Sequence, residues 1–226
     1  MRNLWSCLLF NAVLTLPIIA LPVPAMPQSA VATSEATPAC KDEKGCIKQF
    51  PNVFLRKKNV LWLKLQNGKA KTFTNDNSDG DAYRKYSAAA FYPQWNVAII
   101  EVGYYEGGDV LVVSTSTGSS VTPLAWPHFS PSGKEFASVT CCQAYYCTDG
   151  VEIWSTAVDP PTHVYHRDPE ADRWYWFGGW GNDDQLNLWV SRVAPPDDSS
   201  DDKPPKDAKR TAVVRNARDW QLMDQK

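Results

Sequence analysis

Residues 128–138 read HFSPSGKEFAS, and this stretch carries the strongest indication of the fold. Its apolar positions lie on either side of a Ser-Pro-Ser-Gly turn. Pro131 presets φ for the first part of the turn, and Gly133 supplies a positive φ, which other residues disfavour. The stretch therefore predicts two short strands joined by a tight turn.

Further stretches along the chain have the composition of β-strands. They are rich in β-branched and aromatic residues and are bounded by Gly, Asn, Asp or Pro. No window holds a helical stripe of useful length. Residues 87–91 include three alanines, but Pro93 follows at once and the flanking tyrosines suit a strand equally well. An all-β fold is predicted, with strands at 60–65, 96–102, 109–114, 151–155 and 186–191.

These strands are copies of one unit. VLWLKLQNG at 60–68 aligns with VLVVSTSTG at 110–118, and VEIWSTAVD at 151–159 follows with an aspartate in the glycine position. A fourth copy, NLWVSRV at 187–193, falls in the same frame, so that successive copies start 50, 41 and 36 residues apart. Each copy is preceded by a second marker: FPN at 50–52, FYPQWN at 91–96, FSPSGK at 129–134 and, more loosely, FGGWGN at 177–182. A unit of about forty residues with three or four strands is the signature of a propeller blade.

The 128–138 stretch resembles the WD40-like repeat of secreted and periplasmic bacterial β-propeller proteins, as in the propeller of the Tol-system periplasmic protein. In that family a strand is followed by Ser-Pro-Asp-Gly-Lys and an apolar strand; here Ser132 replaces the Asp, and the other three copies are degenerate. The chain after its N-terminal segment also resembles an uncharacterised secreted bacterial family. The resemblance implies a small β-propeller, or a propeller-like fan, of about four antiparallel blades. A β-sandwich of similar strand count is the alternative.

The N-terminus has the layout of a secretory signal peptide, with a short basic start, an apolar core and a small-residue exit. We expect cleavage after Ala32, and export to the periplasm or the exterior. A membrane anchor is the alternative, but prolines interrupt the apolar run. Removing residues 1–32 takes away Arg2 and no acidic residue, so the formal charge moves from -2 to -3. This near-neutral balance gives no electrostatic reason to expect nucleic acid or an anionic membrane as a partner.

The remaining chain is long enough for one domain with a real core. An extension at 33–49 precedes a single propeller-like domain at 50–226. Within that domain, the acidic and proline-rich run at 195–209 looks unfolded. Residues 211–223 either supply the last outer strand or pair with the N-terminal blade to close the ring.

Five cysteines survive removal of the signal: Cys40, Cys46, Cys141, Cys142 and Cys147. An odd number cannot pair fully within one chain. Our first choice is a Cys40–Cys46 disulfide, with Cys141 or Cys142 bonded to Cys147; a bond between the two groups is the alternative. The CC-x₄-C spacing lacks the C-x₂-C pairs of structural zinc sites and the C-x-x-C of redox sites. The cysteines are therefore predicted to be structural.

Two Tyr-Tyr pairs mark equivalent hairpin tips in the second and third repeats. The third repeat carries three extra residues before its pair, within CCQAYYC at 141–147. Paired tyrosines at repeated tips either pack between blades or line a ligand surface. The candidate binding surface contains Tyr104, Tyr105, Glu106, Tyr145 and Tyr146.

Two hypotheses for the function follow. The first is a non-catalytic binding or scaffolding protein whose partner is a protein or a glycan, since no catalytic motif is present. The alternative is a hydrolase of carbohydrate or peptide with a carboxylate pair drawn from Glu101, Glu106, Asp109 and Asp149.

No cofactor or metal is predicted, although two stretches raise the question. His163 and His166 lie three apart in HVYH, and on a strand such positions point to opposite faces. NDNSDGD at 75–81 begins like a calcium loop, but it starts with Asn and has Tyr86 where the loop needs Glu.

Overall fold

The structure is a computed structural model that describes residues 40–141, 150–168, 173–193, 203–217 and 219–223. The chain divides into residues 1–32 and residues 33–226, and every described residue lies in the second unit. Fifteen strands and two short helices form within the described ranges. The predicted all-β fold class is confirmed.

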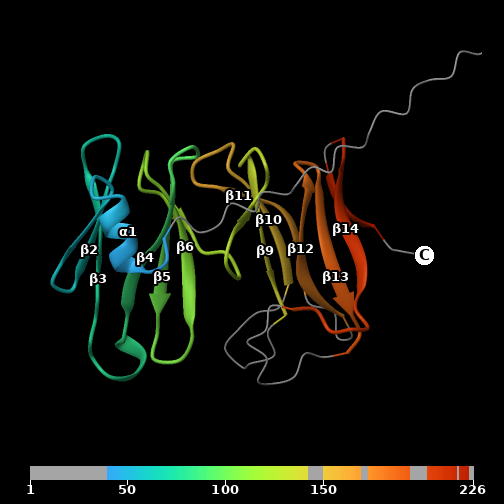
Figure 1. Cartoon of the computed structure of the whole chain (residues 1–226), viewed down its shortest axis with the longest axis horizontal. Coiled ribbons are helices and arrows are strands. Elements are labelled where there is room, and N and C mark those ends of the chain that lie inside the picture. Colours follow the sequence, from blue (N-terminus) through green and yellow to red (C-terminus); the bar gives the residue numbers. More distant parts are fainter. Residues whose placement is uncertain (1–39, 142–149, 169–172, 194–202, 218, 224–226) are drawn as a thin grey trace, which may run out of the picture. The chain divides into compact units, whose positions relative to one another are not determined.

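The strands form four antiparallel sheets, and in each sheet the strands lie in the order of the chain (Figure 1). The first sheet contains β1 (Phe54–Lys57), β2 (Val60–Lys64) and β3 (Ala70–Thr74). The second contains β4 (Lys85–Tyr92), β5 (Val97–Gly103), β6 (Gly108–Ser114) and β7 (Ser120–Val121). The third contains β8 (His128–Phe129), β9 (Glu135–Thr140), β10 (Gly150–Ser155) and β11 (Thr162–Arg167). The fourth contains β12 (Trp174–Asn182), β13 (Gln185–Ser191), β14 (Lys209–Asn216) and β15 (Asp219–Met223).

Three of the four predicted repeat copies occupy equivalent strands. β6 and β10 are each the third strand of a four-stranded sheet. The first sheet has three strands and lacks a counterpart of the first strand of the other sheets, so its middle strand, β2, is equivalent to β6 and β10. The prediction for the fourth copy is wrong by one strand, because this copy lies in β13, the second strand of its sheet. The equivalent strand is β14. A long connection at 192–208 separates β14 from β13 and removes it from the regular spacing.

The C-terminal stretch follows the first of its two predicted alternatives. Residues 211–223 contribute to β14 and β15, which are the last two strands of the fourth sheet, with β15 at its edge. In the described part of the acidic run at 195–209, the Ala208 N–H donates to the Pro205 carbonyl at 3.0 Å and closes a turn. Lys209 then begins β14. The rest of the run, up to residue 202, lies outside the described residues.

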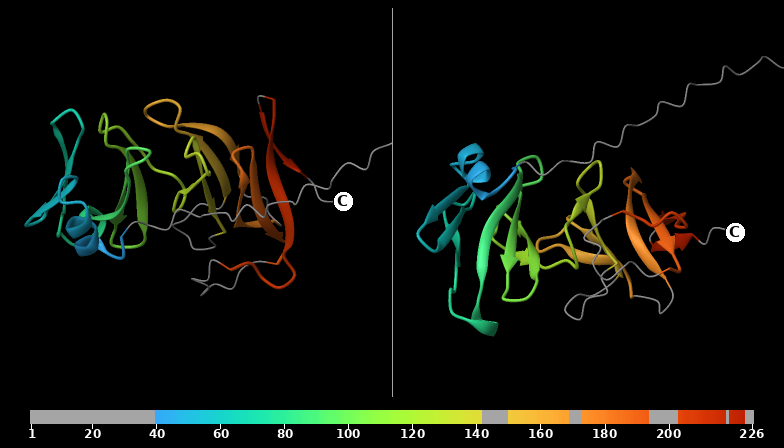
Figure 2. Two further views of the ribbon diagram at one scale, coloured as in Figure 1. Left: turned by 45° about the horizontal axis from the view of Figure 1, so that its top comes forward. Right: turned by 60° about the horizontal axis from the view of Figure 1, so that its bottom comes forward.

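One short helix, α1 (Glu43–Gln49), was not predicted. The Asp42 side chain caps it by accepting a hydrogen bond from the Gly45 N–H at 2.7 Å. Cys46 is fully buried and forms the predicted disulfide with Cys40. The helix contacts β1 and β4, as Figure 2 shows. The disulfide and these contacts hold the helix in place. With seven residues, it is too short to show an apolar stripe in the sequence. A 3₁₀ turn, η1 (Gly80–Ala82), is the other helical element.

Three hydrophobic clusters join sheets that are consecutive in the chain. Ile99 and Ile100 of β5 belong to different clusters, because successive residues of a strand point to opposite faces. The second and third sheets are thus covered on both faces, which explains the nearly continuous apolar sequence of β5 and the burial of five successive residues of β10. Leu63 packs in the cluster of Ile100, Phe136 in that of Ile99, and Ile153 with Leu188 in the third. None of these clusters joins the first sheet to the fourth, and ring closure stays a prediction.

The β8–β9 turn forms as predicted. Gly133 has φ of 68°, and its N–H donates to the Ser130 carbonyl at 2.9 Å. A Cβ atom at this position would lie 2.1 Å from the indole of Trp95. Trp95 belongs to the equivalent β4–β5 turn of the second sheet. The turn markers of the second and third sheets therefore contact one another.

A buried ion pair joins the third and fourth sheets. Arg215 of β14 donates from Nη2 to Glu135 Oε1 of β9, and Glu135 is 5% exposed. Burial raises the pKa of Glu135 above its ordinary value, although Arg215 partly opposes this. The Arg215 guanidinium also lies over the Trp220 ring, 4.6 Å from its centroid.

Candidate functional sites

The predicted tip residues Tyr104, Tyr105 and Glu106 lie in the turn between β5 and β6. The Tyr104 N–H donates to the Gly107 carbonyl at 3.0 Å, and Gly107 has φ of 82°. The turn is therefore a closed hairpin tip. Tyr105 is 68% exposed, the largest exposure among the large hydrophobic side chains described.

Tyr104 is held in place on both its edge and its face. Its hydroxyl donates to Asp109 Oδ2, and the Arg84 guanidinium lies 4.5 Å from the ring centroid. Burial, followed by the hydrogen bond to Asp109, raises the pKa of Tyr104 to about 12. Arg84 is itself fixed by donating to the Asp81 and Tyr83 carbonyls at 2.5 and 2.7 Å. The ring therefore forms a fixed wall rather than a freely rotating side chain.

These residues line a cavity of about 560 Å³. Its wall combines two aromatic rings, one guanidinium and two carboxylates, with backbone from η1. Such a mixture can hydrogen-bond a polar partner while stacking on its flat parts. The lining residues are Gly80, Asp81, Arg84, Tyr104, Tyr105 and Glu106.

The matching tip of the third sheet lies mostly outside the described residues. β9 and β10 pair as an antiparallel hairpin, with Thr140 opposite Gly150, and they hold the same second and third positions in their sheet as β5 and β6 do in theirs. Tyr145, Tyr146, Cys142 and Cys147 belong to the segment that is not described, and the disulfide predicted there stays a prediction.

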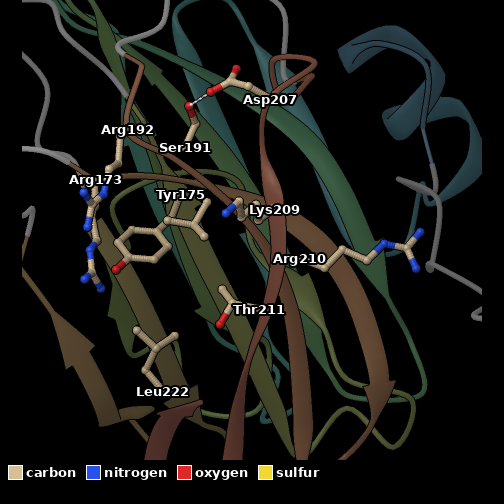
Figure 3. A pocket seen from close by; sticks show the side chains of 10 residues that line it. Arg173, Tyr175, Ser191, Arg192, Asp207, Lys209, Arg210, Thr211 and Leu222 are labelled. Carbon is tan, nitrogen blue, oxygen red and sulfur yellow. Dashed lines mark hydrogen bonds between the residues drawn. The ribbon is translucent and has the colours of Figure 1, made fainter. Parts of the chain in front are cut away.

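A second cavity, of about 630 Å³, lies on the fourth sheet (Figure 3). Sequence analysis did not identify it. Its residues come from four strands and the segments that flank them, and they include four cationic side chains. One available signal was the pair of basic residues, Lys209 and Arg210, at the end of the acidic run. The lining residues are Arg173, Tyr175, Val190, Ser191, Arg192, Asp207, Lys209, Arg210, Thr211 and Leu222.

The two histidines of HVYH share one face, contrary to the prediction. The β10–β11 register shifts between Ile153 and Trp154, so that Glu152 lies opposite His166 and Trp154 opposite His163. This β-bulge inserts one extra residue into β11 and so places both histidine rings on the same side of the sheet. The His163 Nε2 and Glu152 Oε1 atoms are 2.9 Å apart.

Glu152 is the centre of this polar group. It is 4% exposed, and its Oε2 atom accepts from the Trp154 indole at 2.9 Å and from the Leu124 N–H at 3.1 Å. His166 Nε2 lies 2.8 Å from Asp168 Oδ1. The contacts of Glu152 satisfy the hydrogen-bonding capacity of its buried carboxylate. Among the residues that the structure describes, no group of three or more His, Cys, Asp or Glu is arranged to hold a metal ion.

The segment at 75–81 uses its polar side chains locally. Asn75 Oδ1 accepts from the Tyr86 N–H at 2.9 Å, and Asp76 Oδ1 accepts from the Ser78 N–H at 2.9 Å. Hydrogen bonding to Ser78 lowers the pKa of Asp76. The segment is thus a hydrogen-bonded turn between the first two sheets.

The carboxylates of the hydrolase hypothesis do not form a buried pair in the described part of the chain. Glu101 and Glu106 are exposed, and Asp109 is bonded to Tyr104. Asp149 lies outside the described residues.

Comparisons with known proteins found no family model, curated protein or solved structure that matches the chain. No helix within the described ranges has the length and hydropathy needed to cross a membrane.

Proposed function

We propose that the chain is an exported, non-catalytic binding protein of the bacterial envelope, built from propeller-like sheet repeats, whose partner is a protein or a glycan. The single observation that carries this proposal is the cavity at the β5–β6 tip, where a fixed Tyr104 lies beside an exposed Tyr105. Exposed aromatic side chains provide much of the contact energy at binding surfaces. The Cys40–Cys46 disulfide supports export, because such bonds persist in oxidising compartments.

The propeller-like architecture is supported by the four consecutive antiparallel meanders, each packed against the next. In this architecture, the faces of the sheets are occupied by their neighbours. The hairpin tips are then the parts of the chain that remain for a partner.

The test is binding of the purified protein to immobilised glycan and peptide panels. We expect Tyr105→Ala to weaken the best panel interaction by roughly thirty-fold, as for loss of an aromatic hot spot. Tyr105→Phe retains the ring and should retain most of the affinity. Val158→Ala is the matched control, since Val158 is 52% exposed and is not among the residues that line the tip cavity.

Two results would count against the proposal. Release of products from the panel would show an enzyme rather than a binding protein. Equal affinity of the wild type and Tyr105→Ala for every bound compound would show that the tip is not the binding site.

A further inference from the structure

The second cavity lies at the border of the packed face of the fourth sheet. Tyr175 of β12, Val190 of β13 and Lys209 of β14 lie opposite one another in the strand register, so their side chains share one face. Tyr175 and Val190 belong to the cluster that packs against the third sheet. Tyr175 is 2% exposed, whereas Lys209 is exposed, so the row runs from the core to the solvent.

Positive charge is concentrated around this row. Figure 3 shows Arg173 and Arg192 on one side of Tyr175 and Lys209 on the other. Arg167 of β11 adds a further guanidinium, because its Nε donates to the Tyr175 hydroxyl at 3.1 Å. The whole chain has a formal charge of -2, so this concentration is not a consequence of a basic protein.

A single carboxylate is found among the described residues that line the cavity. It belongs to Asp207, which accepts a hydrogen bond from Ser191 Oγ at 2.9 Å. Figure 3 shows this pair at one end of the cavity, away from Leu222. Among the described lining residues, cationic side chains therefore outnumber the one carboxylate, and Val190 and Leu222 form an apolar part.

The volume and chemistry of the cavity define a class of ligand. About 630 Å³ lies within the range of roughly 300–1,000 Å³ that small-molecule sites occupy. Guanidinium groups bind carboxylate and phosphate oxygens through paired hydrogen bonds. A phenol that accepts one hydrogen bond retains an O–H that can donate to an acceptor. An inorganic ion alone would leave the apolar part unfilled.

We propose that this cavity binds a small organic oxyanion, a molecule with a carboxylate or phosphate group on a body about the size of a sugar ring. The oxyanion contacts the cations beside Tyr175, and the body lies against Val190 and Leu222. This site is independent of the β5–β6 tip and adds a ligand to the proposed binding function.

Calorimetric titration of the purified protein tests this assignment. The probes are galacturonate and glucose 6-phosphate, with galactose and glucose as neutral counterparts and inorganic phosphate as the bare ion. We expect at least one organic anion to bind roughly ten-fold or more tightly than its neutral counterpart, which cannot form the charge-assisted hydrogen bonds. The same anion should bind roughly ten-fold or more tightly than inorganic phosphate, which lacks the organic body.

Two exposed lysines provide a matched pair of variants. Lys209→Met should weaken binding of the organic anion roughly ten-fold. Lys69→Met removes the same charge from an exposed position that is not among the residues lining the cavity. It should leave affinity nearly unchanged. Arg192→Gln is a second test of the cation set, and a thermal melt of each variant confirms folding.

Several results would overturn the assignment. Equal binding of charged and neutral sugars would show that the cations contribute nothing to affinity. Equal losses in Lys209→Met and Lys69→Met would indicate a general surface charge effect. Inorganic phosphate binding as tightly as the organic anions would show that the organic body of the ligand contributes nothing to affinity. The acidic residues at 197–202 are potential competitors for the same cations. If binding occurs only after Asp197, Asp198, Asp201 and Asp202 are changed to Asn, the chain itself is the occupant.

Discussion

Replacement of Arg215 by Met tests how the third and fourth sheets are held together. The substitution keeps an apolar stem of similar length but leaves the Glu135 carboxylate buried without its cation. Breaking a buried ion pair on one side costs about 3–5 kcal/mol. The Arg215 side chain is 29% exposed, and solvent screening therefore places the expected loss near the lower end, about 3 kcal/mol of unfolding free energy at pH 7.

The same substitution makes a prediction about pH. A carboxyl group whose pKa is higher in the folded state contributes stability that is fully present below its unfolded pKa and is lost as the pH rises through its folded pKa. Burial places Glu135 in this class, and Arg215 opposes the shift. Removing Arg215 therefore raises the pKa of Glu135 further. Below pH 4.5, the ordinary value for this group, the carboxyl is neutral and the charge penalty disappears. The loss should fall to about 1–2 kcal/mol there, from the hydrogen bond and the contact with Trp220.

Urea unfolding at pH 7 and pH 4, followed by tryptophan fluorescence, measures both losses. The double variant Glu135→Gln/Arg215→Met carries no buried charge and should be more stable at pH 7 than Arg215→Met alone. Arg210→Met, on the same strand but exposed, should cost little at either pH. A loss for Arg215→Met that is the same at both pH values, or a double variant no more stable than the single one, would refute the reasoning.

Three further predictions concern stability. Gly133→Ala should cost about 1–3 kcal/mol more in urea unfolding than Gly68→Ala, because both have positive φ but only a Cβ at Gly133 meets an indole; equal losses would contradict this. Replacing Cys40 and Cys46 together by Ser should lower the unfolding free energy by about 2 kcal/mol, since the closed loop is short, and the wild type under reducing conditions should match it. Burial alone would raise the pKa of Asp159, but hydrogen bonds from three hydroxyl groups outweigh it and the net pKa is lowered. The stability that Asp159 contributes is present above pH 3.8 and lost on further acidification, so the difference between the wild type and Asp159→Asn should narrow between pH 6 and pH 3.

Strands and turns were predictable because their physical causes are local. The predicted strand at 96–102 became β5, shifted by one residue, since β-branched residues and the bounding Asn96 act over a few positions. Gly133 adopts the positive φ that its place after Pro131 implies. The Cys40–Cys46 bond is likewise short-range in sequence.

The incorrect predictions depended on contacts distant in sequence or on a change of register. A bulge in β11 places His163 and His166 on one face, and alternation along a strand gives no sign of it. α1 has only seven residues, too few to show helical periodicity in the sequence. One disulfide and packing against β1 and β4 hold it in place. The fourth repeat copy was placed one strand early because the β13–β14 connection is long.

The cavity on the fourth sheet was missed for a related reason. Its cations are separated in the sequence by up to 37 residues, from Arg173 to Arg210, and strand pairing alone brings them together. Single basic residues at strand ends are common in the sequence and carry no signal until the register is known.

Both proposed binding sites border the hairpin that joins the second and third strand positions of a sheet. In the first sheet this hairpin has two residues, 58–59; in the second it spans 104–107 and contains the tyrosines of the tip cavity. In the third it spans 141–149, and in the fourth 192–208, which contributes Arg192 and Asp207 to the cationic cavity. The strands on either side are constrained on every face that packs against a neighbouring sheet. The repeats thus share a common packing plan, whereas the length and chemistry of this hairpin differ from one sheet to the next, and in the second and fourth sheets the hairpin borders a candidate binding site.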